Sequence, residues 1–92
     1  MIGKWKLVKQ TQNGQVTNPK DTYQEFMPGN IFEGTREGKS RKGTWKLSED
    51  NKTLTIGVSV IKVKYDIIYF DATKRTISNP ELGTLEYEKV NE

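Results

Sequence analysis

Turn-forming residue pairs recur every eight to twelve residues and divide the chain into short segments in which apolar and polar residues alternate. The turns lie at Asn13-Gly14, Asn18-Pro19, Pro28-Gly29, Glu37-Gly38, Asp50-Asn51, Asp71 to Lys74 and Asn79-Pro80. A period of two is typical of a β-strand with one buried face, and no longer stretch shows the period of a helix. The pattern therefore restricts the chain to an antiparallel all-β fold.

The alternating segments predict about eight strands. They lie at about 3–12, 21–27, 30–37, 41–48, 52–58, 61–71, 75–79 and 83–90. The longest connection, Thr11 to Lys20, is rich in Asn and Gln and is expected to be a solvated polar loop. Short antiparallel strands joined by tight turns remove their exposed edges most completely by closing on themselves. We therefore expect residues 1–92 to form a single small antiparallel up-and-down β-barrel.

The same period assigns side chains to the two faces of the sheet. The predicted interior set is Trp5, Leu7, Phe26, Phe32, Trp45, Leu47, Leu54, Ile56, Val58, Tyr65, Ile67, Tyr69, Ile77, Leu85 and Tyr87. The opposite face carries mainly Lys, Thr, Asp and Glu, as expected for an outer surface in contact with water.

Two places complicate this assignment. Apolar residues occupy even-numbered positions up to Val58 and odd-numbered positions from Ile61 onward. Residues 57–61 therefore form either a tight hairpin or a bulge. Ile68 and Phe70 fall on the polar face next to one another, which suggests a small apolar patch. A contact through that patch would make the protein a weak homodimer, and without it a monomer is expected.

Composition excludes several classes of site. The 92 residues contain no Cys and no His, so thiolate metal sites, disulfides and the commonest general base are absent. No pair of acidic residues has a spacing diagnostic of catalysis, and we expect neither an enzyme nor a bound metal or cofactor. A net charge of +3 with mixed signs along the chain does not indicate a nucleic-acid-binding arm. No transmembrane segment is expected, and the compartment is either cytoplasmic or, if a leader was removed, periplasmic or secreted.

The phrase Gly-x-Trp-Lys-Leu begins two of the expected strands, at Gly3 to Leu7 and at Gly43 to Leu47. The first copy resembles the opening of lipocalins and other calycins. The second is followed by an acidic turn and by Lys52-Thr53-Leu54, which is similar to short bacterial lipocalin-like domains. The Phe26 to Asn30 hairpin and the closing strand with Leu85-Glu86-Tyr87 extend the resemblance over nearly the whole chain.

This resemblance implies that Trp5 closes one end of an eight-stranded barrel, next to Gly3. It also implies that a cation from the last strand lies across the indole, and the matching position is Lys89. Lipocalins favour Arg there, and a Lys would contribute about 0.5–1 kcal/mol as a cation–π contact.

An eight-stranded barrel is just wide enough to be filled by side chains or to hold one small ligand. The first hypothesis is therefore a non-enzymatic barrel that binds a small hydrophobic or amphipathic molecule in its interior. Its candidate ligand-binding residues are Tyr23, Phe26, Phe32, Trp45, Ile56, Tyr65, Ile67, Tyr69 and Tyr87. The many large aromatic side chains equally favour a filled core, which would leave a structural or protein-interaction domain without a ligand.

A third hypothesis concerns the basic hairpin formed by Arg36, Lys39, Arg41 and Lys42. Such a cluster could bind an anion or single-stranded nucleic acid. Because the aromatic residues are expected to point inward, away from these cations, no nucleic-acid partner is expected, and a solvated hairpin tip is the simpler interpretation.

Overall fold

The computed structural model describes residues 1–90 and consists, over that range, of strands and turns without a helix. The strands are β1 (Gly3–Gln12), β2 (Gln15–Thr17), β3 (Thr22–Met27), β4 (Ile31–Arg36), β5 (Lys39–Leu47), β6 (Thr53–Val58), β7 (Ile61–Phe70), β8 (Lys74–Asn79) and β9 (Gly83–Lys89). In this part of the chain no helix is long and apolar enough to span a membrane.

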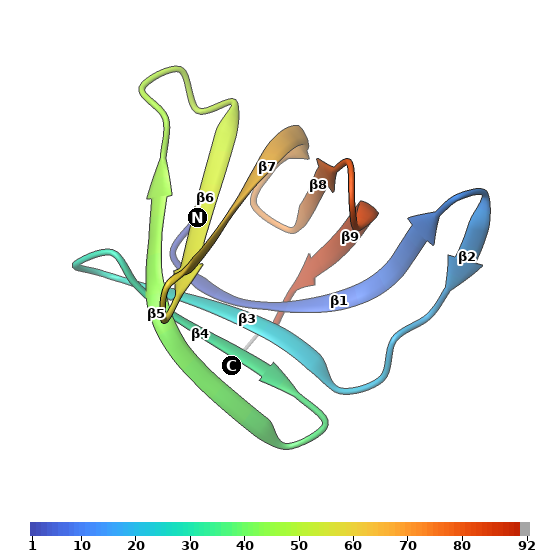
Figure 1. Ribbon diagram of the computed structural model, residues 1–92, viewed down its shortest axis with the longest axis horizontal. Helices are drawn as coiled ribbons and strands as arrows, with labels where there is room; N and C mark the ends of the chain where they lie inside the picture. Colours follow the sequence, from blue (N-terminus) through green and yellow to red (C-terminus); the bar gives the residue numbers. More distant parts are fainter. Residues whose placement is uncertain (91–92) are drawn as a thin grey trace.

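All nine strands belong to one antiparallel sheet with the order β2-β1-β3-β4-β5-β6-β7-β8-β9. Pairing of β1 with β9 closes the sheet, so β1 and β3 to β9 form an eight-stranded up-and-down barrel (Figure 1). This confirms the predicted fold class. Closure leaves no free edge among the eight strands of the wall.

The expected polar loop at Thr11 to Lys20 is partly a strand. β2 pairs with the end of β1, with Gln12 opposite Gln15 and Gln10 opposite Thr17. The turn between the two strands is the Asn13-Gly14 pair, in which both residues have positive φ. Figure 1 shows this β1–β2 hairpin extending beyond the barrel wall. The sequence failed to predict β2 because it is only three residues long and all three are exposed.

The interior is filled by side chains from all around the wall. The buried apolar set is Trp5, Leu7, Phe26, Phe32, Leu54, Ile56, Tyr65, Ile77, Leu85 and Tyr87. All ten were predicted to face inward. Trp45, Leu47, Val58 and Ile67 were also predicted, and they pack against this core while partly exposed.

Tyr69 is an exception, because it is 52% exposed and lies on the outer face. A β-bulge at Ile68 causes this: Ile67 lies opposite Ile77, whereas Tyr69 already lies opposite Thr76. One extra residue reverses the alternation for the rest of the strand. The prediction that Tyr69 faces the interior is therefore wrong.

The same bulge changes the environment of Phe70. This residue was predicted to lie on the polar face, but its ring packs 5.8 Å from that of Trp5. Ile68 remains exposed, without Phe70 as a neighbour on the outer face. Both side chains are exposed, Ile68 to 62% and Phe70 to 41%, but the bulge turns them to different faces of the strand, so they do not form the single outer-face patch that the sequence suggested.

The phase change at residues 57–61 is a tight hairpin. Val58 and Ile61 lie opposite one another, and Ser59 and Val60 connect the strands. Ser59 has a φ of 59°, the left-handed conformation that two-residue hairpins require. Of the two alternatives that the sequence left open, the hairpin is the one observed.

Candidate functional site

The two ends of the barrel differ in how completely they are closed. Trp5 lies near the end formed by the start of β1 and the end of β9, which we call the Trp5 end. At the opposite end, which we call the groove end, the curved inner surface of β3, β4 and β5 forms an open groove of about 520 Å³. Its lining residues are Thr22, Tyr23, Gln24, Phe32, Gly34, Thr35, Arg36, Glu37, Lys39, Arg41 and Val58.

Strand register arranges the inner face of this groove in rows, because residues directly opposite in neighbouring strands point to the same side. The row at the mouth is Thr22, Arg36 and Lys39, the middle row is Gln24, Gly34 and Arg41, and the deepest row is Phe26, Phe32 and Gly43. Polarity therefore falls with depth. The mouth is cationic, and the deepest row is aromatic.

Gly34 makes a notch in the middle row. Its neighbours in the row are an amide and a guanidinium, and its own position carries no side chain. A Cβ there would lie 3.2 Å from the ring of Phe32, so the ring occupies the space next to the missing side chain. The Phe32 ring therefore forms the floor of the notch, and hydrogen-bond donors lie on both sides of it.

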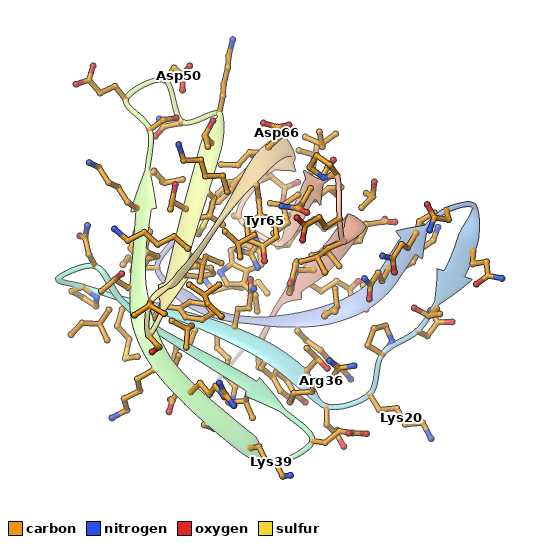
Figure 2. All side chains as sticks on the ribbon, in the orientation of Figure 1. Lys20, Arg36, Lys39, Asp50, Tyr65 and Asp66 are labelled. Carbon is orange, nitrogen blue, oxygen red and sulfur yellow. The ribbon has the colours of Figure 1, made fainter. Side chains whose placement is uncertain are left out.

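The basic hairpin is divided between the two faces of the sheet. Arg36, Lys39 and Arg41 line the groove, whereas Lys42 lies opposite Glu33 and therefore on the outer face. Figure 2 shows Arg36 and Lys39 at the tip of the β4–β5 hairpin, far from Asp50. Among residues 1–90, none of the three groove cations has a carboxylate oxygen within 4.0 Å.

Behind the middle row lies a buried cation that the sequence analysis did not identify. Arg75 is 0% exposed, and its Nη2 donates a hydrogen bond to Oε1 of Gln24 at 2.5 Å. Its guanidinium carbon lies 4.1 Å, 4.7 Å and 5.3 Å from the ring centroids of Tyr87, Phe26 and Trp5. Within the described chain the Nε atom has no hydrogen-bond partner.

The charge of Arg75 is retained at neutral pH. Burial lowers the pKa of its guanidinium to about 10, still well above 7. Burial also raises the pKa values of the neighbouring phenols Tyr65 and Tyr87, which are therefore neutral and leave the cation uncompensated. Aromatic faces and one amide oxygen take the place of a carboxylate.

At the Trp5 end, a second cation lies over the same indole. The Nζ atom of Lys89 is 5.1 Å from the ring centroid of Trp5 and donates a 2.9 Å hydrogen bond to the carbonyl of Ile2. Gly3 has a φ of 127°, a backbone conformation that residues with a side chain rarely adopt, which explains why glycine stands there. The indole Nε1 donates to the carbonyl of Met1.

A smaller pocket of about 290 Å³ also lies at this end, lined by Met1, Leu47, Asn51, Ile67 and Phe70. It contains no charged side chain. In the described chain, no group of three or more acidic residues is placed to hold a metal ion.

No protein-family model and no curated protein matches this sequence. Two solved structures are similar over almost the whole chain. One is a lipocalin-like protein from Bacteroides uniformis, with a TM-score of 0.81 and 14% identity over 97% of both chains. The fold is lipocalin-like. The other, an uncharacterized protein from Bacteroides eggerthii, gives a TM-score of 0.78 and 14% identity over 97% of this chain and 98% of that one. At this identity the similarity establishes the fold alone.

Within the lipocalin-like barrel, the predicted ligand-binding residues are dispersed. Phe32 lines the groove, and Ile67 lines the smaller pocket. Tyr23 borders the groove, but it lies opposite Lys6 and Thr35 on the outer face, where Nζ of Lys4 is 4.9 Å from its ring centroid. The prediction that Tyr23 faces the interior is therefore wrong. Phe26, Ile56, Tyr65 and Tyr87 are buried in the packed interior. Trp45 packs edge-on against Phe26 and donates its indole hydrogen to the carbonyl of Met27. Tyr69 points outward and donates to Asp71, whose pKa falls to about 2 mainly because of that bond.

The cations that face the interior, of which the sequence singled out all but Arg75, follow the same period of two. Arg75 precedes the predicted interior residue Ile77 by two positions, and Arg36 follows Phe32 by four. Lys39 and Arg41 likewise share the phase of Trp45. The alternation assigns these cations to the inner face of the lipocalin-like barrel, whereas their charge favours contact with water.

Proposed function

We propose that this lipocalin-like barrel is a non-enzymatic binding protein that holds a small amphipathic molecule in the groove at the groove end. The observation that carries the proposal is the groove itself. Its volume of about 520 Å³ is within the range of about 300–1,000 Å³ usual for small-molecule sites. Apolar surface from Phe32 and Val58 and polar groups at the mouth give it the two-sided character that an amphipathic ligand requires.

The packing of the interior supports this position for the ligand. Phe26, Leu54 and Ile77 fill the interior and are completely inaccessible. A molecule could enter the centre only by displacing them, at the cost of their buried apolar area. The groove requires no such displacement, so the ligand is expected at the end of the barrel instead of along its axis.

No catalysis is included in the proposal. The groove contains one carboxylate, that of Glu37, and no second acidic group next to it. General acid–base chemistry by carboxylates usually needs two groups with different pKa values facing the substrate. The side chains of the groove are suited to hold a molecule unchanged.

Titration of labelled protein with 1-octanol and with octanoate tests the proposal by NMR. We expect the backbone amide signals of Phe32, Gly34 and Val58 to shift in a saturable way, while those of Leu54 and Ile77 in the core remain in place. Absence of saturable shifts at the groove with either compound would contradict the proposal.

A blocking variant provides the control. Gly34→Val adds a branched side chain to the notch, against the Phe32 ring, and is expected to abolish binding. Thr55→Val on β6 introduces the same side chain on the outer face and should bind normally, because Thr55 lies opposite the outer-face residues Lys46 and Lys64. Equal binding by the two variants would place the ligand elsewhere.

A structural domain without a ligand is the second candidate, and the filled interior favours it. This role predicts that neither compound shifts the groove signals. The same titration therefore separates the two candidates.

A further inference from the structure

We infer that the ligand of the groove carries an acidic group, which is held over Gly34 between the guanidinium of Arg41 and the amide of Gln24. Arg36 and Lys39 cover it from the mouth. This inference rests on the proposed function, since it names the chemical class of the molecule bound at that site. The ligand is a small organic anion with an apolar body, such as an alkyl carboxylate or alkyl phosphate.

Charge is separated across the sheet at the groove end. On the inner face, the two outermost rows carry three cations and no acidic residue. On the outer face, Glu25 and Glu33 lie opposite one another, and Lys42 lies opposite Glu33. The acids of this hairpin are thus placed where they cannot neutralise the groove, and Glu37 in the turn is the single acid of its lining.

Two like charges repel one another at the mouth of the groove. Arg36 and Lys39 lie directly opposite one another on the inner face. Side chains in such positions are close neighbours, and like charges there are destabilising. No carboxylate within residues 1–90 pairs with either of them. An anion in the groove would convert this repulsion into attraction, which gives a physical reason for the arrangement.

The hydrogen bond from Arg75 fixes the orientation of the Gln24 amide. An arginine only donates hydrogen bonds, so the hydrogen bond from Arg75 requires that the carbonyl of the amide faces Arg75. The NH2 group of Gln24 consequently points away from Arg75, and Gln24 lines the groove. The buried charge of Arg75 also polarises this amide and strengthens its donors. The middle row therefore presents donors on both sides of the glycine notch.

The side chains deeper in the groove indicate the chemistry of the rest of the ligand. Phe32 lies in the row below Gly34, and Val58 closes the side toward β6. These apolar surfaces suit a short alkyl chain or a flat ring extending inward from the acidic group. A charged group at both ends would leave one of them on the aromatic floor without a partner.

Binding of four probes with the same eight-carbon chain tests the inference. Octanoate and octyl phosphate are expected to bind about tenfold or more tightly than 1-octanol, because hydrogen bonds to charged groups are the strong ones. Octyltrimethylammonium should bind more weakly than the alcohol. Affinity for octanoate should fall as salt is added, while affinity for 1-octanol should not.

Two variants with the same charge change separate recognition from general electrostatics. Arg41→Gln is expected to weaken octanoate binding about tenfold and to leave 1-octanol binding unchanged. Lys42→Gln removes a cation from the next position of the same strand, on the outer face, and should change octanoate binding less than about twofold. Both side chains are exposed, so both variants should fold, which circular dichroism would verify.

The outcomes distinguish the inference from the proposed function. If 1-octanol binds in the groove as tightly as octanoate and Arg41→Gln has no effect, the inference is wrong while the proposed function stands. If no probe binds, the proposed function fails as well. Equal losses in Arg41→Gln and Lys42→Gln, with tight binding of a short oligothymidylate, would overturn the inference in favour of a nucleic-acid surface.

Discussion

The two ends of the barrel both concentrate positive charge, and they use it differently. At the Trp5 end, Arg75 and Lys89 lie over aromatic rings, and Arg75 is completely buried. At the groove end, Arg36, Lys39 and Arg41 are exposed and, in the described part of the chain, have neither a ring nor a carboxylate as partner. The surroundings of a cation, and not its mere presence, therefore determine whether it contributes to the packing of the barrel or is available to bind a ligand.

This difference has a measurable consequence. Side chains that contact the buried cation should determine the free energy of unfolding, because their contacts are lost only when the chain unfolds. Side chains of the groove cations contact water, so they should matter for ligand affinity and hardly for stability.

Trp5→Ala should lower the free energy of unfolding by about 3–5 kcal/mol, the usual cost of removing a buried large aromatic side chain. Trp5 is 1% exposed, and its ring centroid lies 5.3 Å from the guanidinium carbon of Arg75 and 5.1 Å from Nζ of Lys89. Urea denaturation measures the loss, and the milder Trp5→Phe keeps the protein folded if the first variant does not fold. A loss below about 1 kcal/mol would show that Trp5 is not central to the packing of this end.

Gln24→Ala should lower the free energy of unfolding by about 1–3 kcal/mol, because it leaves a buried guanidinium without its amide acceptor. The matched control is Gln12→Ala, since Gln12 is exposed and its amide bonds the carbonyl of Glu81 at the surface. That control should lose about 0.5 kcal/mol or less. If both variants lose the same amount, Arg75 does not depend on Gln24.

The two ends also differ in how far the sequence predicted them. Trp5, Leu7 and Ile77 were correctly placed because an apolar residue at alternate positions has one physical reason to be buried. Arg75 has the same phase as Ile77, yet a charge is expected in water, so only the three-dimensional arrangement of rings reveals that it is inside. The alternation predicts which face of the sheet a side chain occupies, but it does not predict the free energy of burying that side chain there.

The groove illustrates a second limit. Its rows depend on the register of β3, β4 and β5, and a register is a relation between strands that one strand's pattern does not specify. The bulge at Ile68 is a similar case, because one unpaired residue moved Tyr69 outward and Phe70 toward Trp5. Neither turn residues nor glycine mark that position in the sequence.

Lys89→Met should lower the free energy of unfolding by about 0.5–1 kcal/mol, the size of a partly exposed cation–π contact. Met retains an unbranched apolar chain over the indole of Trp5 but loses the charge and the hydrogen bond to Ile2. Thermal unfolding followed by circular dichroism measures the difference. A loss as large as that of Trp5→Ala would mean that Lys89 holds the end closed mainly through its charge.

At the groove end, the substitution Lys39→Gln should raise the free energy of unfolding by up to about 0.5 kcal/mol, because it relieves the repulsion from Arg36 across the strand pair. Lys42→Gln, three residues away, should lower it by a similar amount, because Lys42 lies opposite Glu33. Both differences should shrink when salt is added, since exposed charges are screened. Denaturation of the two variants at low and high salt gives the comparison. If Lys39→Gln destabilises the protein as Lys42→Gln does, the groove cations have partners within the protein, and the two ends of the barrel do not differ in the way proposed.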